Sequence, residues 1–116
     1  MQTIDFNKIS ELRELDDDGS DSVLKELVSL FLQSTPPKLK KIIECYYLKD
    51  FSTVRKEAHS LRSSSLSLGA EVLSQLAHDL EYAKEGPELE TQMGEAIKKL
   101  NPEFLSLKAE LEKLVA

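Results

Sequence analysis

The sequence predicts an all-α fold, an antiparallel four-helix bundle with a short additional helix at the N-terminus. Apolar residues recur every three or four positions along the 116 residues, and no stretch shows the alternation typical of strands. Acidic, glycine- or proline-containing segments interrupt this period at residues 16–19, 50–52 and 85–87, so the predicted connections are short. Short connections make consecutive helices antiparallel neighbours. The length is typical of one domain, and we expect residues 1–116 to form a single helical bundle domain.

The first helix is predicted from a capping residue and from apolar spacing. Asp5 is a favourable N-cap, and Ile9 and Leu12 lie on the inner side of a helix over residues 6–15. The acidic run at residues 16–19 is interpreted as a solvent-exposed turn. A calcium-binding loop would need further oxygen ligands at set spacing and a closing glutamate, and the sequence lacks them.

The next helical stretch carries a helix-start signal in its middle. Ser20 or Asp21 begins a helix with a wide apolar stripe, which we expect to stop before Thr35. Threonine as N-cap followed by proline in the first turn is a standard helix start, so a restart is predicted at Thr35. The helical period then continues to about Leu48.

Two further helices and a long final segment complete the predicted bundle. Ser52 is a suitable N-cap for a helix over residues 52–66, and Ser67 for a helix over residues 67–85. These two helices should form a hairpin, and the glycine and proline that follow should end the second one. The apolar period of the final segment continues through Asn101-Pro102, where either the helix kinks or Asn101 caps a new one.

The helix over residues 52–66 presents two different faces. At about 100° per residue, one stripe holds small or apolar side chains: Phe51, Val54, Ala58, Leu61, Ser65 and Leu68. The outward face, on which residues three or four apart are neighbours, carries His59, Arg62, Ser63 and Leu66. Counting back from the turn of the hairpin places Glu81 opposite His59. The same count places His78 opposite Arg62.

Residues 58–70 and several later positions match a known pattern in register. The matching residues are Ala58-His59-Ser60-Leu61-Arg62, Ser65, Leu68-Gly69-Ala70, Leu73 and Leu80-Glu81. Over about residues 4–86 the chain therefore resembles a histidine-containing phosphotransfer (HPt) domain, whose pattern is roughly A-H-x-L-K-G-x-S-x-x-L-G-A. The chain departs from this pattern at Arg62, where the family usually has lysine, and at Ser63, where it usually has glycine.

The resemblance implies that His59 is the phosphoryl-accepting residue. Histidine suits this role because its ordinary pKa of about 6.5 leaves the ring mostly neutral near pH 7. Arg62, one turn further on, would hold the charged phosphohistidine, and Glu81 would accept a hydrogen bond from the ring and set its tautomer. Ser63 is expected to be tolerated, with its hydroxyl bonded back to the His59 carbonyl or donating to a phosphoryl oxygen.

The resemblance also implies partners. A response-regulator receiver domain, a hybrid histidine kinase, or both would dock beside the histidine, with Leu66 and His78 as the predicted docking residues. In the family the acceptor aspartate and the divalent metal belong to the receiver domain. We therefore expect a phosphocarrier that is not an enzyme, with no cofactor and no metal of its own.

The leading hypothesis is a stand-alone phosphotransfer protein that relays a phosphoryl group through His59, between receiver aspartates or from a histidine kinase, in a two-component phosphorelay. One alternative is an HPt-like adaptor that binds receivers without carrying phosphate, and Ser63 is its main support. The other is the phospho-accepting subunit of a split histidine kinase, which would need a separate kinase subunit.

Composition excludes several classes of partner. The net charge is −6 and the sequence pI is about 5.0, which argues against nucleic acid and against an anionic membrane surface. Cys45 is the single cysteine, so no disulfide can form within the chain. No leader-like start and no apolar run of about 18 residues is present, so a cytoplasmic location is expected.

Other chemistries are poorly supported by the spacing. Zinc binding by His59, His78 and Cys45 matches no recognised ligand pattern. Serine nucleophile chemistry at residues 63–65 lacks an oxyanion hole and a third group to orient the histidine. Three residues near the end of the predicted helix over residues 67–85 are interpreted as ordinary surface: Tyr82, Lys84 and Glu85.

Overall fold

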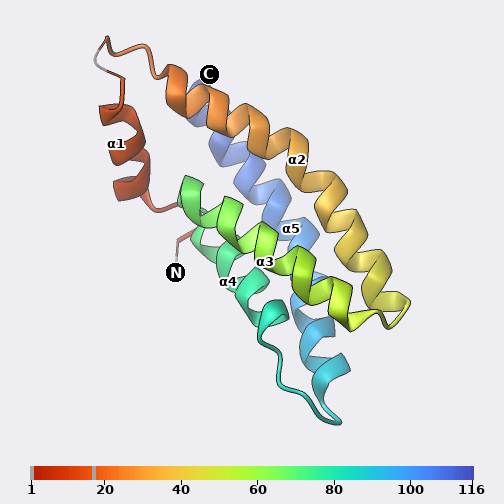
Figure 1. The fold of residues 1–116 in the computed structure, drawn as a ribbon. Helices are drawn as coiled ribbons and strands as arrows, with labels where there is room; N and C mark the ends of the chain where they lie inside the picture. Colours follow the sequence, from red (N-terminus) through yellow and green to blue (C-terminus); the bar gives the residue numbers. More distant parts are fainter. Residues whose placement is uncertain (1, 17) are drawn as a thin grey trace.

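The computed structural model describes residues 2–16 and 18–116, and all regular structure in these residues is helical (Figure 1). The helices are α1 (Phe6–Glu14), α2 (Ser22–Tyr47), α3 (Phe51–Leu68), α4 (Glu71–Glu81) and α5 (Leu89–Val115). Helices α2 to α5 form a closed ring in which each packs against two neighbours, and α1 lies across one end of α2 and α3. Consecutive helices of the ring run in opposite directions (Figure 1). The predicted all-α class is confirmed.

One core fills the space between the helices, and all five contribute to it. On α3 the predicted inner stripe is confirmed, because five of its six members are buried: Val54, Ala58, Leu61, Ser65 and Leu68. Phe51, at the start of the helix, is only partly buried. Full burial of a leucine contributes about 1.5–3 kcal/mol, so this stripe fixes the rotation of α3 and points its other face outward. That all 116 residues make one domain stays a prediction.

The predicted restart at Thr35 is wrong, because α2 continues without a break through Pro36 and Pro37. Both prolines lie on the exposed face of the helix, where the carbonyls that lose their intrahelical donors can accept hydrogen bonds from water. Thr35 is fully buried on the opposite face, in line with the apolar stripe, and does not cap a helix. The final segment behaves in the same way, since α5 runs through Pro102 as one helix.

The caps of the first two helices differ in how well the sequence predicted them. The Asp5 side chain accepts a hydrogen bond from the Asn7 backbone at 3.0 Å, which confirms it as the cap of α1. At the start of α2, Asp21 makes no capping hydrogen bond. The carboxylate of Asp16 instead accepts from the Val23 backbone at 2.9 Å. The predicted acidic turn includes position 17, which lies outside the described residues.

Asp50, and not Ser52, caps α3. Its carboxylate accepts from the Thr53 hydroxyl at 2.6 Å and from the Thr53 backbone N–H at 3.2 Å. The hydrogen bond from the hydroxyl, followed by the backbone bond, lowers the pKa of Asp50 below its usual value. The helix therefore begins at Phe51, one residue before the predicted cap.

Helix α3 ends at Leu68, two residues after the predicted end at Leu66. Ser67 is still within α3, where its hydroxyl donates to the Ser64 carbonyl at 2.8 Å, and does not cap α4. The chain turns at Gly69, whose φ of 78° lies in the left-handed region that favours glycine. The Gly69 carbonyl also accepts from the Asp5 backbone N–H at 2.7 Å, which ties α1 to this turn. Helix α4 then ends at Glu81, four residues before the predicted end.

Candidate functional site

His59 lies in the middle of α3, on the face opposite the core. Its side chain is 63% exposed, while the preceding residue, Ala58, is fully buried. Burial of the inner stripe therefore places the imidazole at the surface of the bundle, where a second protein can reach it. The predicted outward position of His59 is confirmed.

Glu81, the last residue of α4, lies against the imidazole as the hairpin geometry predicted. Its Oε2 atom is 2.6 Å from His59 Nδ1. An ionised carboxylate can only accept, so the proton of the neutral ring is on Nδ1 and the lone pair is on Nε2. The Glu81 side chain is only 14% exposed, so the inner nitrogen of the ring is held by the protein. The outer nitrogen, Nε2, is free to act as a nucleophile.

Arg62 completes this cluster from one turn further along α3. Its Nη1 atom is 3.4 Å from Glu81 Oε1, and its guanidinium lies 5.7 Å from the centre of the Tyr82 ring. A guanidinium over an aromatic face is attracted by the ring electrons. The arginine is thus held beside His59 by a carboxylate and an aromatic ring, with its charge near the imidazole.

Tyr82 was missed by the sequence analysis, which treated it as ordinary surface. Its ring contacts Arg62 and also lies 4.9 Å, centre to centre, from the His78 ring. Tyr82 follows His78 by four positions, so the two share a helix face, and this spacing is the signal that points to it.

Arg55 was also missed, although it precedes His59 by four positions on the outward side of α3. Its guanidinium donates to the backbone carbonyls of Glu81 and Ala83, at 2.8 and 2.7 Å, and pairs with Glu85 at 2.9 Å. These bonds lie at the C-terminus of α4, where helix carbonyls have no intrahelical donor. They account for the early end of α4, because the carbonyls are satisfied by α3.

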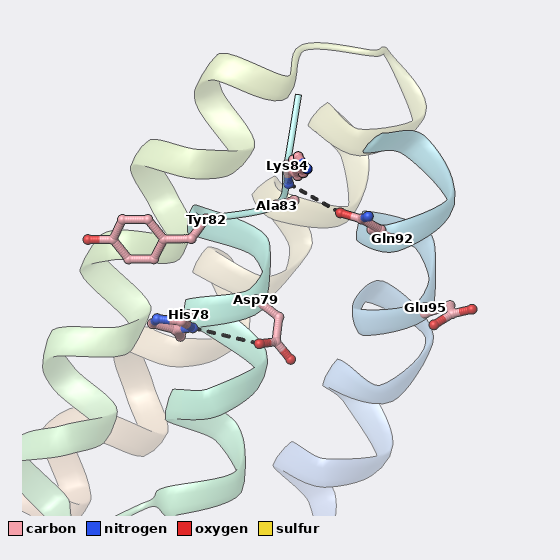
Figure 2. Close-up of a pocket in the computed structure, with 7 residues that line it drawn as sticks. All are labelled: His78, Asp79, Tyr82, Ala83, Lys84, Gln92 and Glu95. Carbon is pink, nitrogen blue, oxygen red and sulfur yellow. Dashed lines mark hydrogen bonds and ion pairs between the residues drawn. The ribbon is translucent and has the colours of Figure 1, made fainter. Parts of the chain in front are cut away.

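The predicted docking residues lie on α3 and α4, the two helices that carry the cluster around His59. Leu66 is 52% exposed on α3, which confirms its outward phase. His78 lies on α4, and the Tyr82 ring lies beside both His78 and Arg62. Figure 2 shows His78 beside Asp79, with 3.7 Å between the ring Nδ1 and the carboxylate. Their roles in docking stay predictions.

Ser63 is exposed one turn beyond His59. Among the described residues its hydroxyl makes no hydrogen bond, so the predicted bond back to the His59 carbonyl is not formed. The space beside the histidine is therefore bounded by a small side chain. Its role at a phosphoryl group stays a prediction.

A surface pocket of about 350 Å³ opens beside this cluster, between the end of α4 and the start of α5 (Figure 2). Its lining residues are His78, Asp79, Tyr82, Ala83, Lys84, Gln92 and Glu95. The Lys84 backbone N–H donates to the Gln92 side chain at 3.2 Å, which ties the α4–α5 connection to α5. The pocket is open and of mixed polarity, so it extends the surface beside Tyr82 without forming an enclosed binding site.

In the part of the chain that the structure describes, no three histidine, cysteine, aspartate or glutamate side chains are grouped so as to hold a metal ion. His59, His78 and Cys45 are therefore not gathered into a zinc site. None of the described helices has the length and apolarity that crossing a bilayer requires.

A comparison with known protein families matches residues 26–116 to the Hpt domain. The chain belongs to the Hpt domain family. It is also similar to histidine-containing phosphotransfer protein 2 of Arabidopsis thaliana, with 27% identity over 109 residues, which cover 91% of this chain and 69% of that protein. A comparison with solved structures gives no match.

The matched region of this Hpt domain includes the whole of α3, α4 and α5 and most of α2, and so contains every residue of the cluster around His59. Helix α1 precedes it. Membership of the Hpt family supports a role in two-component phosphorelay signalling in general, and members of this family are phosphocarriers and not catalysts.

Proposed function

We propose that this Hpt protein is a stand-alone phosphocarrier that receives a phosphoryl group on Nε2 of His59 and passes it to a receiver-domain aspartate. The donor is another receiver aspartate or a histidine kinase. The observation that carries the proposal is the 2.6 Å contact between His59 Nδ1 and Glu81, which fixes the reactive tautomer. The exposed outer edge of the ring supports it further.

The proposed step is a direct displacement at phosphorus. The Nε2 lone pair of His59 forms the P–N bond while the P–O bond to the donor aspartate breaks, and the aspartate leaves as a carboxylate. The ring gains positive charge as it attacks, and the Nδ1–H bond to the Glu81 carboxylate stabilises that charge. The reverse displacement, by the carboxylate of the next aspartate, returns the ring to its neutral form.

Transfer from a phosphorylated receiver domain tests this proposal directly. Wild-type protein should gain a label that is lost in acid and retained in alkali, as expected of a phosphoramidate, while the receiver loses its own. Binding of the receiver without any label would favour the adaptor hypothesis. A label acquired only from a kinase core with ATP, and never returned to a receiver, would favour the split-kinase hypothesis. The cytoplasmic location expected from the sequence stays a prediction.

Arg62 is expected to stabilise the phosphorylated state more than the free one. Hydrogen bonds to charged groups contribute about 1.5–3 kcal/mol, so Arg62→Ala should slow transfer or shorten the phosphohistidine lifetime by about tenfold. Arg62→Lys keeps the charge that the family usually places here and should be close to wild type. Single-turnover transfer from a receiver measures both variants, and equal rates for wild type and Arg62→Ala would remove the arginine from the site.

Leu66 is expected to lie in the apolar part of the docking surface. Leu66→Glu should raise the KM for a receiver by about tenfold, since a charged side chain would be buried against the partner. Its melting temperature should not change, because the side chain is 52% exposed. Leu105→Glu is the matched control, since Leu105 is 64% exposed on α5, which does not pack against α3. Equal effects of the two substitutions would contradict a docking role.

Substitutions of Ser63 test whether a serine in place of the family's usual glycine affects phosphotransfer. Ser63→Gly should keep or raise the transfer rate and lower stability slightly, because glycine inside a helix costs about 0.5–1 kcal/mol relative to alanine. Ser63→Val adds bulk beside His59 and should impair transfer. Inert wild-type protein beside an active Ser63→Gly variant would show that the serine blocks phosphotransfer, in favour of the adaptor hypothesis.

A further inference from the structure

We propose that Arg55 is a positioning residue for phosphotransfer, because it fixes the backbone from which Glu81 reaches His59. This inference rests on the proposed function of His59. The three polar contacts of the Arg55 guanidinium all lie at the end of α4: the Glu81 carbonyl at 2.8 Å, the Ala83 carbonyl at 2.7 Å and the Glu85 carboxylate at 2.9 Å. Its side chain is only 25% exposed.

The two carbonyl bonds lie on either side of Tyr82 and so hold the backbone over three consecutive residues. Helix α4 ends at Glu81, and its last helical hydrogen bond runs from the Tyr82 backbone N–H to the His78 carbonyl at 3.0 Å, after which the chain leaves the helix. A cation at a helix C-terminus is also favoured by the helix dipole. The planar fork of an arginine binds two acceptors at once, which a lysine ammonium does only as a mobile point charge. Arg55 therefore sets the direction in which the Glu81 side chain leaves the helix.

The link to His59 is geometric. Arg55 and His59 are four positions apart, so they lie one turn from each other on the same face of α3. Helix α3 thus holds the backbone of Glu81 through Arg55 and its carboxylate through His59, at 2.6 Å. Arg62 holds the same carboxylate by a longer contact of 3.4 Å. Loss of Arg55 leaves the carboxylate to be positioned by these side-chain contacts alone.

The ion pair with Glu85 does not carry this role. The Glu85 side chain is 82% exposed, and exposed ion pairs contribute little because water screens them. Glu85→Gln removes the charge of this partner and leaves both carbonyl bonds intact. It separates the effect of the carbonyl bonds from the effect of the ion pair.

The expected consequence of losing Arg55 is a change in the tautomer of neutral His59. In the wild type the proton lies on Nδ1, because Glu81 accepts it there. When the Glu81 carboxylate is no longer held in place, the ring also populates the tautomer with the proton on Nε2. In that form Nε2 has no lone pair with which to attack the phosphoryl group. The transfer rate therefore falls as the population of the reactive tautomer falls.

The experiment measures the tautomer of His59 in the full ¹⁵N-labelled chain by long-range ¹H–¹⁵N correlation, at a pH well above the ordinary histidine pKa of about 6.5. Wild type and Glu85→Gln should show the Nδ1–H form. Arg55→Gln should show a mixture and a transfer rate reduced by about tenfold, the size of one charge-assisted hydrogen bond. Arg55→Lys should lie between them. Lys41→Ala, which removes a 3.3 Å ion pair to Glu57 elsewhere on α3, is the matched control and should resemble wild type.

An unchanged tautomer and an unchanged rate in Arg55→Gln, with only a lower melting temperature, would overturn the inference, because Arg55 would then be merely structural. Should Arg55→Gln fail to fold, the same comparison is made with Arg55→Lys. The tautomer is read without any phosphate present. If the wild type takes no label but Arg55→Gln shifts the tautomer, the positioning role is supported and the proposed function fails. If the wild type is labelled but the variant keeps the wild-type tautomer, the proposed function stands and the positioning role fails.

Discussion

Replacing His59 with glutamine abolishes acid-labile phosphorylation and leaves the bundle nearly as stable as the wild type. Glutamine has no ring nitrogen to form a P–N bond, so the loss should be complete and not partial. Its amide N–H can still donate to the Glu81 carboxylate, which preserves the polar contact of the site. The side chain is 63% exposed, and surface substitutions of this kind usually change the free energy of unfolding by less than about 0.5 kcal/mol.

The measurement is labelling by a phosphorylated receiver, with the melting temperature recorded on the same preparations. His78→Gln is the matched control, because His78 is the other histidine of the chain and lies on the adjacent helix. It should still be labelled. Label that persists in His59→Gln and disappears in His78→Gln would show that His78 carries the phosphoryl group, and would contradict the proposal.

Replacing Gly69 with alanine destabilises the protein by about 2–5 kcal/mol, the sum of two separate costs. An alanine held in the left-handed region, at a φ of 78°, costs about 1–2 kcal/mol. The added Cβ would also lie 2.9 Å from the Cβ of Lys8 and 3.0 Å from the Asp5 carbonyl oxygen. Crowding of this kind costs about 1–3 kcal/mol. The backbone of α1 must therefore move away from the α3–α4 turn.

Urea unfolding measures this loss, and Gly19→Ala isolates its origin. Gly19 has a similar φ of 72° but, among the residues that the structure describes, nothing within 4 Å of an added Cβ. Gly19→Ala should therefore show only the backbone cost. Equal losses in the two variants would mean that the contact between α1 and the turn adds nothing, and that the left-handed conformation alone requires glycine at position 69.

The helical class, the inner face of α3 and the outward position of His59 could be predicted from the sequence because each is a local property. In a helix, the direction of a side chain follows from its position along the chain, so burial of Ala58 and Leu61 fixes where His59 points. The position of Glu81 opposite His59 could be predicted as well, because a short turn joins α3 to α4. Counting residues from that turn pairs positions on the two helices almost independently of how they pack.

The ends of the helices and the support of the site were decided by contacts between helices. The sequence around Thr35 contains a standard helix start, yet burial of Thr35 within a continuous apolar stripe keeps α2 in one piece. The end of α4 was predicted from its glycine and proline, yet Arg55 takes up the carbonyls of Glu81 and Ala83 before that signal is reached. A hydrogen bond between residues 26 positions apart cannot be predicted from the apolar spacing of either helix, because it depends on how the two helices pack together.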